Sequence, residues 1–181
     1  FEESYGSQKA EILNELMFQI PVPWGSVRYD AFTYHYAFDY LKRNKPRLLY
    51  IAFDETDEYA HEGKYGQYLK AANALDGFIK NLWDWLQSDY RYKNKTTLIV
   101  TTDHGRGDDP VDSWRHHGSD VEGAEKVWIA VLGPDTPALG EIDNSITIYS
   151  SQIAKTISTL LGVEYTNKEA VGNVIERMIH D

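Results

Sequence analysis

The apolar residues of this chain are arranged in two patterns. Some form short continuous runs, and others recur at helical spacing along longer segments. The short runs predict buried strands at residues 47–53, 97–101 and 126–132, of which the first follows a chain breaker. Helical spacing of apolar residues predicts helices at residues 8–19, 31–44, 64–88 and 149–161. Strands that alternate with long helices are typical of an α/β fold with a mostly parallel sheet flanked by helices.

Two acid–histidine pairs lie just past predicted strands, where open α/β sheets place their chemistry. Asp57 and His61 are four residues apart in FDETDEYAHEG, so they share a face if this segment turns helically. Both side chains could then reach one metal ion. Asp54 is the rival carboxylate. A solvated acidic turn is the structural alternative, because glutamates crowd the same stretch.

The second pair, Asp103 and His104, directly follows the run TLIVTT. Neighbouring side chains on a strand point to opposite faces, so a turn is needed to aim both at one ion. Gly105 and Gly107 would permit such a turn. The structural alternative for this pair is a glycine-rich exit loop with a satisfied histidine.

A third element, RHHGSD, offers another imidazole shortly afterwards. His117 is the candidate ligand because Gly118 lets the backbone bend to present it, and His116 is its alternative. We interpret His35 and His180 as structural or surface residues. The remaining carboxylates of this region are interpreted as a solvated loop: Asp108, Asp109 and Asp112.

The composition narrows the chemistry. A formal net charge of −10 argues against nucleic acid or an anionic membrane as the main partner. Bound divalent metal would still allow an anionic substrate. The chain contains no cysteine, which leaves histidines and carboxylates as the strong metal ligands. No apolar stretch approaches the ~20 residues of a membrane span.

In their order and spacing, these motifs resemble the alkaline phosphatase superfamily of metalloenzymes, which includes phosphatases, phosphodiesterases, sulfatases and phosphoglycerate mutases. The family's Asp-x-x-x-His pair is similar to Asp57–His61, and its strand followed by Asp-His-Gly is similar to residues 99–105. Its last histidine, ahead of a strand ending in Gly-Pro, is similar to His117 ahead of residues 128–134. The resemblance covers residues 45–162.

The resemblance implies a two-metal site. Asp57, His61 and His117 would hold one ion. Asp103 and His104 would hold the other, together with an earlier aspartate and a serine or threonine nucleophile. The ions would be zinc, with manganese or another divalent ion as alternatives. The implied activity is hydrolysis of phosphoric or sulfuric esters through a covalent nucleophile, with a small anionic ester as substrate. An extracytoplasmic location is expected from the family.

The chain departs from the family in its first part. Residues 1–53 show no strand–Asp–loop–nucleophile pattern, and Ser4, Ser7 and Ser26 lack that context. We therefore expect residues 1–181 to be the C-terminal part of a single alkaline-phosphatase-like catalytic domain, with an incomplete sheet. The nucleophile would lie outside this chain, in the N-terminal half of the same enzyme, and the chain alone would be inactive. The alternative is a non-catalytic α/β metal-binding or binding module.

Overall fold

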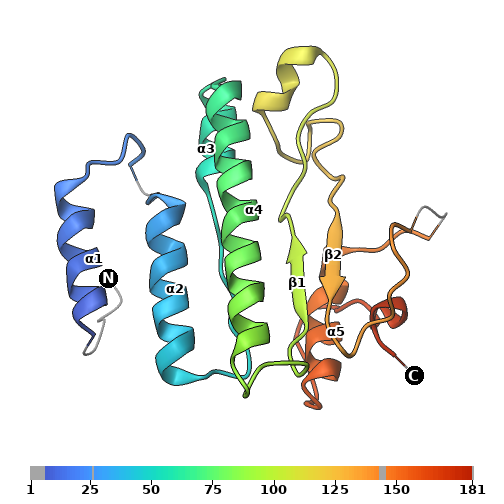
Figure 1. The fold of residues 1–181 in the computed structure, drawn as a ribbon. Helices are drawn as coiled ribbons and strands as arrows, with labels where there is room; N and C mark the ends of the chain where they lie inside the picture. The colour runs from blue at the N-terminus through green and yellow to red at the C-terminus, as the bar shows by residue number, and fades with distance from the viewer. Residues whose placement is uncertain (1–6, 26, 143–145, 181) are drawn as a thin grey trace. The chain divides into compact units, whose positions relative to one another are not determined.

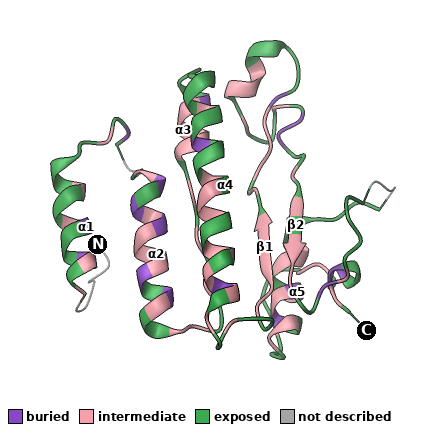
Figure 2. Ribbon diagram, viewed as in Figure 1, coloured by how far each residue is buried: buried purple, intermediate pink, exposed green. Residues whose placement is uncertain are grey.

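The computed structural model describes residues 7–25, 27–142 and 146–180 (Figure 1). Ser4 and Ser26 therefore lie outside the described residues. The chain divides into two compact units, residues 1–82 and residues 83–181, and buried residues occur in both (Figure 2). Whether the two units belong to one catalytic domain stays a prediction.

The N-terminal unit is built on the helices that the apolar spacing predicts. Helix α1 (Gln8–Gln19) packs against α2 (Asp30–Asn44), and both predictions are confirmed. Ser7 caps α1, because its hydroxyl accepts the N–H of Ala10 at 3.0 Å. Helix α2 ends at Lys45, which adopts a left-handed conformation just before Pro46.

Helix α3 (Glu55–His61) is short, and the long α4 (Tyr65–Ser88) follows it. The ring of Tyr34 on α2 stacks on Phe78 of α4, with centroids 4.4 Å apart and planes 8° apart. Phe32, Tyr34 and Leu41 of α2 are buried, whereas Tyr40 is exposed. Aromatic packing between α2 and α4 thus contributes to the core of this unit.

The strand predicted at residues 47–53 is not formed, and this expectation was wrong. The segment runs without ladder hydrogen bonds, and Leu48 and Tyr50 are 56% and 84% exposed. An apolar run shows that a segment suits a strand, but the strand itself requires a partner. Within the described residues, this segment has no partner strand.

The C-terminal unit contains β1 (Leu98–Thr101) and β2 (Ile129–Leu132), which form the one sheet found in the described residues. The strands pair antiparallel, with Leu98 opposite Leu132 and Thr101 opposite Ile129. The expectation of parallel strands was therefore wrong for this pair, and the strands are half-buried rather than buried. The connecting residues 102–128 contain no α-helix, whereas a parallel connection usually requires one.

The last helix of this unit confirms the prediction at residues 149–161. A 3-10 turn at Ser150–Gln152 leads into α5 (Ile153–Leu160). Gly162 ends the helix with a positive φ of 66°, where glycine has no Cβ to clash. A further 3-10 turn spans Glu176–Met178. None of the helices in the described residues has the length and apolar character of a membrane span.

Candidate metal centre

The first acid–histidine pair lies on α3, in the N-terminal unit. Asp57 and His61 are one helical turn apart, and Asp57 Oδ2 lies 3.4 Å from His61 Nε2. Both side chains are partly exposed, at 33% and 40%. Asp54 instead occupies the N-cap of α3 and makes no capping hydrogen bond through its side chain. The structure thus pairs His61 with Asp57, which favours Asp57 over Asp54 as its partner.

The second pair lies just beyond β1, in the C-terminal unit. His104 Nε2 is 3.7 Å from Asp103 Oδ1, and the His104 backbone N–H donates to the same oxygen at 3.0 Å. His104 Nδ1 lies 2.9 Å from the carbonyl oxygen of Gly105. Because a carbonyl can only accept, this contact places the ring proton on Nδ1 and leaves Nε2 as the donor for a metal.

His117 lies against His104 in the same unit. The two imidazole rings are stacked, with centroids 3.8 Å apart and planes 14° apart. His116 is exposed, and its backbone carbonyl accepts the N–H of Gly107 at 3.2 Å. Of the two histidines left open by the sequence, His117 is therefore the one whose ring joins His104.

The antiparallel register explains why these residues meet. It places the end of β1 beside the start of β2, so residues 102–128 form one long loop at that end of the sheet. Within the loop, the N–H of Gly105 donates to the carbonyl of Ala124 at 2.7 Å. The exposed side chains of Lys126 and Asp108 form an ion pair. These contacts tie the first part of the loop to its last part.

Two contacts near the candidate ligands, one in each unit, have no local signal in the sequence. The Asp108–Lys126 ion pair spans 18 residues, and no local pattern announces it. The carboxylate of Asp30 accepts the N–H of Asp54 at the start of α3, across 24 residues.

His35, interpreted as structural, lies on α2 with Nδ1 at 3.4 Å from Lys9 Nζ. Burial and the charges of Lys9 and Lys42 lower the pKa of His35.

The donor sets suit a divalent metal. Two donors bound about 2.0–2.1 Å from a tetrahedral zinc ion lie about 3.4 Å from each other. The separations of 3.4 Å in Asp57–His61 and 3.7 Å in Asp103–His104 are close to this value. Each pair therefore has the spacing of two ligands on one ion. In a chain without cysteine, such carboxylate and imidazole donors also have the chemistry that zinc accepts.

The comparisons with known proteins agree with this chemistry. A family model described as the metalloenzyme superfamily matches residues 27–164, well over half of the chain. This family belongs to the alkaline-phosphatase-like superfamily. The match includes both acid–histidine pairs and His117, and it leaves α1 outside. Comparison with curated proteins and with solved structures gives no match.

Proposed function

This chain belongs to the metalloenzyme superfamily, and from that premise we propose that it is part of a metal-dependent hydrolase of phosphoric or sulfuric esters. Membership indicates an enzyme that uses a divalent metal. The observation that carries the proposal is the spacing of the two acid–histidine pairs, 3.4 Å and 3.7 Å between donor atoms. Both pairs present one imidazole and one carboxylate, the donors that hydrolytic zinc sites use.

In this proposal, Asp57, His61 and His117 hold one ion, and Asp103 and His104 hold the other. The stacking of His104 on His117 supports a metal centre that includes both rings, because their ligand atoms lie within 4.8 Å of each other. In two-metal sites the ions lie about 3.5–4 Å apart, so neighbouring side chains can bind neighbouring ions. Zinc is the proposed metal, and manganese is the first alternative.

When bound, such ions would supply Lewis-acid stabilisation of charge on the oxygens of the ester. The chain's own residues would hold the ions and orient their ligands. His104 does so through Nδ1, whose proton is held by the Gly105 carbonyl. We place the nucleophile in the N-terminal half of the enzyme, outside this chain. Ser7, the described serine of the three considered, already caps α1 and donates to Asp39.

Metal content is the direct test. Zinc would be loaded and the chain dialysed, and zinc would be measured by elemental analysis in the wild type, His61→Ala, and His180→Ala as a matched control. We expect the wild type to hold about one or two zinc ions per chain, and His61→Ala to lose one. His180→Ala should keep the wild-type content, because His180 is exposed and distant in sequence from both pairs. Equal content in all three proteins, or none in any, would contradict the proposed site.

Hydrolysis of model esters tests the placement of the nucleophile. The zinc-loaded chain would be assayed with aryl phosphate, aryl phosphodiester and aryl sulfate substrates. We expect very slow turnover, because the covalent route needs a hydroxyl that this chain does not supply. Fast turnover by the chain alone would place the nucleophile within it. Zinc binding in the complete enzyme without any hydrolysis would favour the non-catalytic metal-binding module.

A further inference from the structure

Asp30 is a buried charge that the proposed ligand set does not explain. It is the first residue of α2, and it is only 1% exposed. Burying a carboxylate is costly unless its partners offset the loss of water. Burial raises the pKa of Asp30, and two backbone hydrogen bonds act in the opposite direction. A residue held at such a cost is expected to have a specific role.

The partners of Asp30 are the first amides of α3. Its Oδ1 accepts the N–H of Asp54 at 2.8 Å, and the N–H of Glu55 lies 3.4 Å from both carboxylate oxygens. The first N–H groups of a helix have no partner within that helix. The N-cap residue usually supplies one, but the side chain of Asp54 makes no capping bond. Asp30 therefore caps α3 from another helix, 24 residues earlier.

This cap acts on the turn that carries the proposed ligands. Helix α3 has only seven residues, too few to be stable without tertiary contacts. The Asp57 N–H donates to the carbonyl of Asp54 at 2.9 Å, so Asp57 belongs to the capped turn. His61 follows one turn later. A negative charge at the start of a helix also interacts favourably with the helix dipole.

We propose that Asp30 is a positioning residue that fixes the first turn of α3 and thereby holds Asp57 and His61 in the orientation a metal ion requires. The inference rests on the proposed function for the ligand roles of Asp57 and His61. The capping interaction itself exists without a metal.

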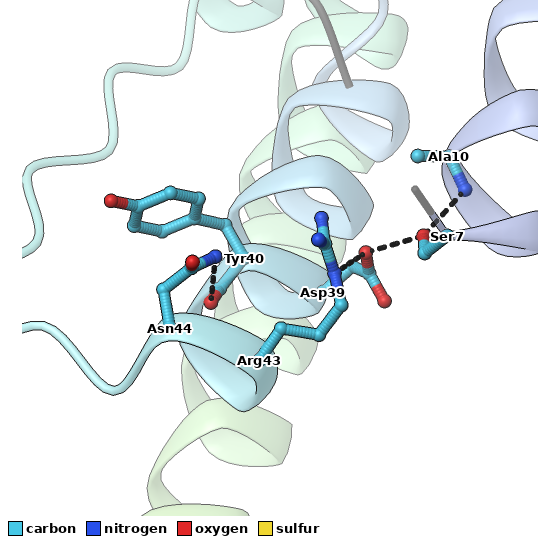
Figure 3. A network of polar contacts seen from close by, with 6 residues as sticks. All are labelled: Ser7, Ala10, Asp39, Tyr40, Arg43 and Asn44. Atoms are coloured by element: carbon cyan, nitrogen blue, oxygen red, sulfur yellow. Dashed lines mark hydrogen bonds and ion pairs between the residues drawn. The ribbon is translucent and has the colours of Figure 1, made fainter. Parts of the chain in front are cut away.

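Zinc affinity tests the role toward the metal. Competition titration with a chelator would compare the wild-type chain with Asp30→Ala, Asp30→Asn and the matched control Asp39→Asn. Asp39 is another buried carboxylate on α2, but it bonds to Ser7 and Arg43 rather than to α3 (Figure 3). We expect Asp30→Ala to bind zinc about 10–100-fold more weakly, as for other residues that orient metal ligands.

The conservative variants distinguish positioning from general damage. Asp30→Asn should lie between the wild type and Asp30→Ala, because an amide oxygen still accepts the N–H of Asp54. Asp39→Asn should keep the wild-type affinity within about twofold, because Asp39 does not contact a proposed ligand or its helix. Wild-type affinity in both Asp30 variants would overturn the inference. So would an equal loss in Asp39→Asn.

Amide hydrogen exchange at residues 54–61, measured without metal, separates this inference from the proposed function. Loss of the cap should speed exchange across α3 in Asp30→Ala and leave Asp39→Asn unchanged there. If α3 responds in this way while the wild type binds no zinc, the proposed function fails and the cap alone remains. If exchange at α3 is the same in all variants, the positioning role fails whatever the zinc content. If Asp30→Ala does not fold, exchange at residues 54–61 would be compared between Asp30→Asn, the wild type and Asp39→Asn.

Discussion

At the scale of single residues, Gly105 shows how closely the loop beside His104 is packed. A Cβ added at Gly105 would overlap the carbonyl oxygen of Lys126 and lie 2.7 Å from the carbonyl oxygen of Gly123. Both obstacles are backbone atoms, which cannot move aside as the end of a side chain can. The role of this glycine is close approach between two parts of the loop, and its backbone also binds Ala124 and the ring of His104.

Gly105→Ala should therefore damage the C-terminal unit and its metal ligands together. We expect the free energy of unfolding to fall by about 1–3 kcal/mol, as for other overpacked sites. Zinc affinity should also fall, because the shifted carbonyl no longer orients His104. Denaturant unfolding and zinc titration provide the measurements. Gly77→Ala is the control: a Cβ at that helical position meets nothing within 4 Å, so stability should rise by about 0.5–1 kcal/mol.

At the scale of elements, a hydrogen bond between Ser7, the N-cap of α1, and Asp39 joins α1 to α2, and an ion pair within α2 supports it. Asp39 on α2 accepts the hydroxyl of Ser7 at 2.8 Å and Nε of Arg43 at 2.7 Å (Figure 3). Burial alone would raise the pKa of Asp39. The hydrogen bonds from Ser7 and Arg43, with the charges of Arg43 and Lys9, nevertheless hold it below its ordinary value. The ionised form is therefore favoured by folding.

This lowered pKa predicts a pH dependence with a definite sign. The contribution of Asp39 is fully present above its unfolded pKa, near 3.8, and is lost as the pH falls through the lower folded value. Asp39→Asn should cost about 1 kcal/mol at pH 7. Its unfolding free energy should decline less steeply below about pH 4 than that of the wild type. Urea unfolding across this pH range measures both effects, and parallel pH profiles would contradict the prediction.

The end of α2 offers a stabilising change. Lys45 has φ 53° and ψ 50°, a left-handed conformation that disfavours residues with a Cβ. Its N–H closes the helix by donating to Leu41. Lys45→Gly should keep this backbone bond and raise the free energy of unfolding by up to about 1 kcal/mol. A thermal unfolding midpoint at or below that of the wild type would show that side-chain contacts of Lys45 outweigh the relieved strain.

The helices of this chain could be predicted because local information determines them. Apolar spacing and end residues such as Pro46 and Gly162 placed α1, α2, α4 and α5 within a few residues. The strands were less predictable, because pairing is a property of two segments. The run at 47–53 has no partner strand in the described residues, and its own sequence does not reveal this. The run TLIVT likewise does not specify that its neighbouring strand is antiparallel.

In the candidate site, too, local features could be predicted from the sequence, whereas contacts between distant residues could not. The Asp57–His61 spacing depends only on one helical turn, which the structure contains. The stacking of His104 on His117 depends on how the loop folds back, and the capping role of Asp30 depends on a contact across 24 residues. Short motifs indicate which residues carry chemistry. The contacts that orient them are formed by distant parts of the chain and leave no local pattern.

At the scale of the whole molecule, each of the two units carries candidate metal ligands of its own. Asp57 and His61 come from the N-terminal unit, and His104 and His117 come from the C-terminal unit. A ligand that binds the folded state stabilises it by about 2.7 kcal/mol at 100 times its Kd. Zinc would therefore stabilise each unit that contributes ligands to it.

We therefore predict that zinc protects the ligand-bearing parts of both units. Hydrogen exchange should slow in peptides from α3 and from the residues around His104 on addition of zinc to the wild type. In His117→Ala the protection around His104 should decrease, because His117 lies against His104 in the same unit and its imidazole is lost as a ligand. His180→Ala should behave as the wild type. Full protection around His104 in His117→Ala would show that His117 does not bind the metal.

The dependence of α3 on Asp30 also has a consequence for the order of folding. A seven-residue helix nucleates poorly by itself, and its cap becomes available only after a loop of 24 residues has closed. The longer α1, α2 and α4 contain more local contacts and can form earlier. We expect α3 to be the last helix of the N-terminal unit to become ordered. Capture of the metal would then follow the folding of this unit instead of initiating it.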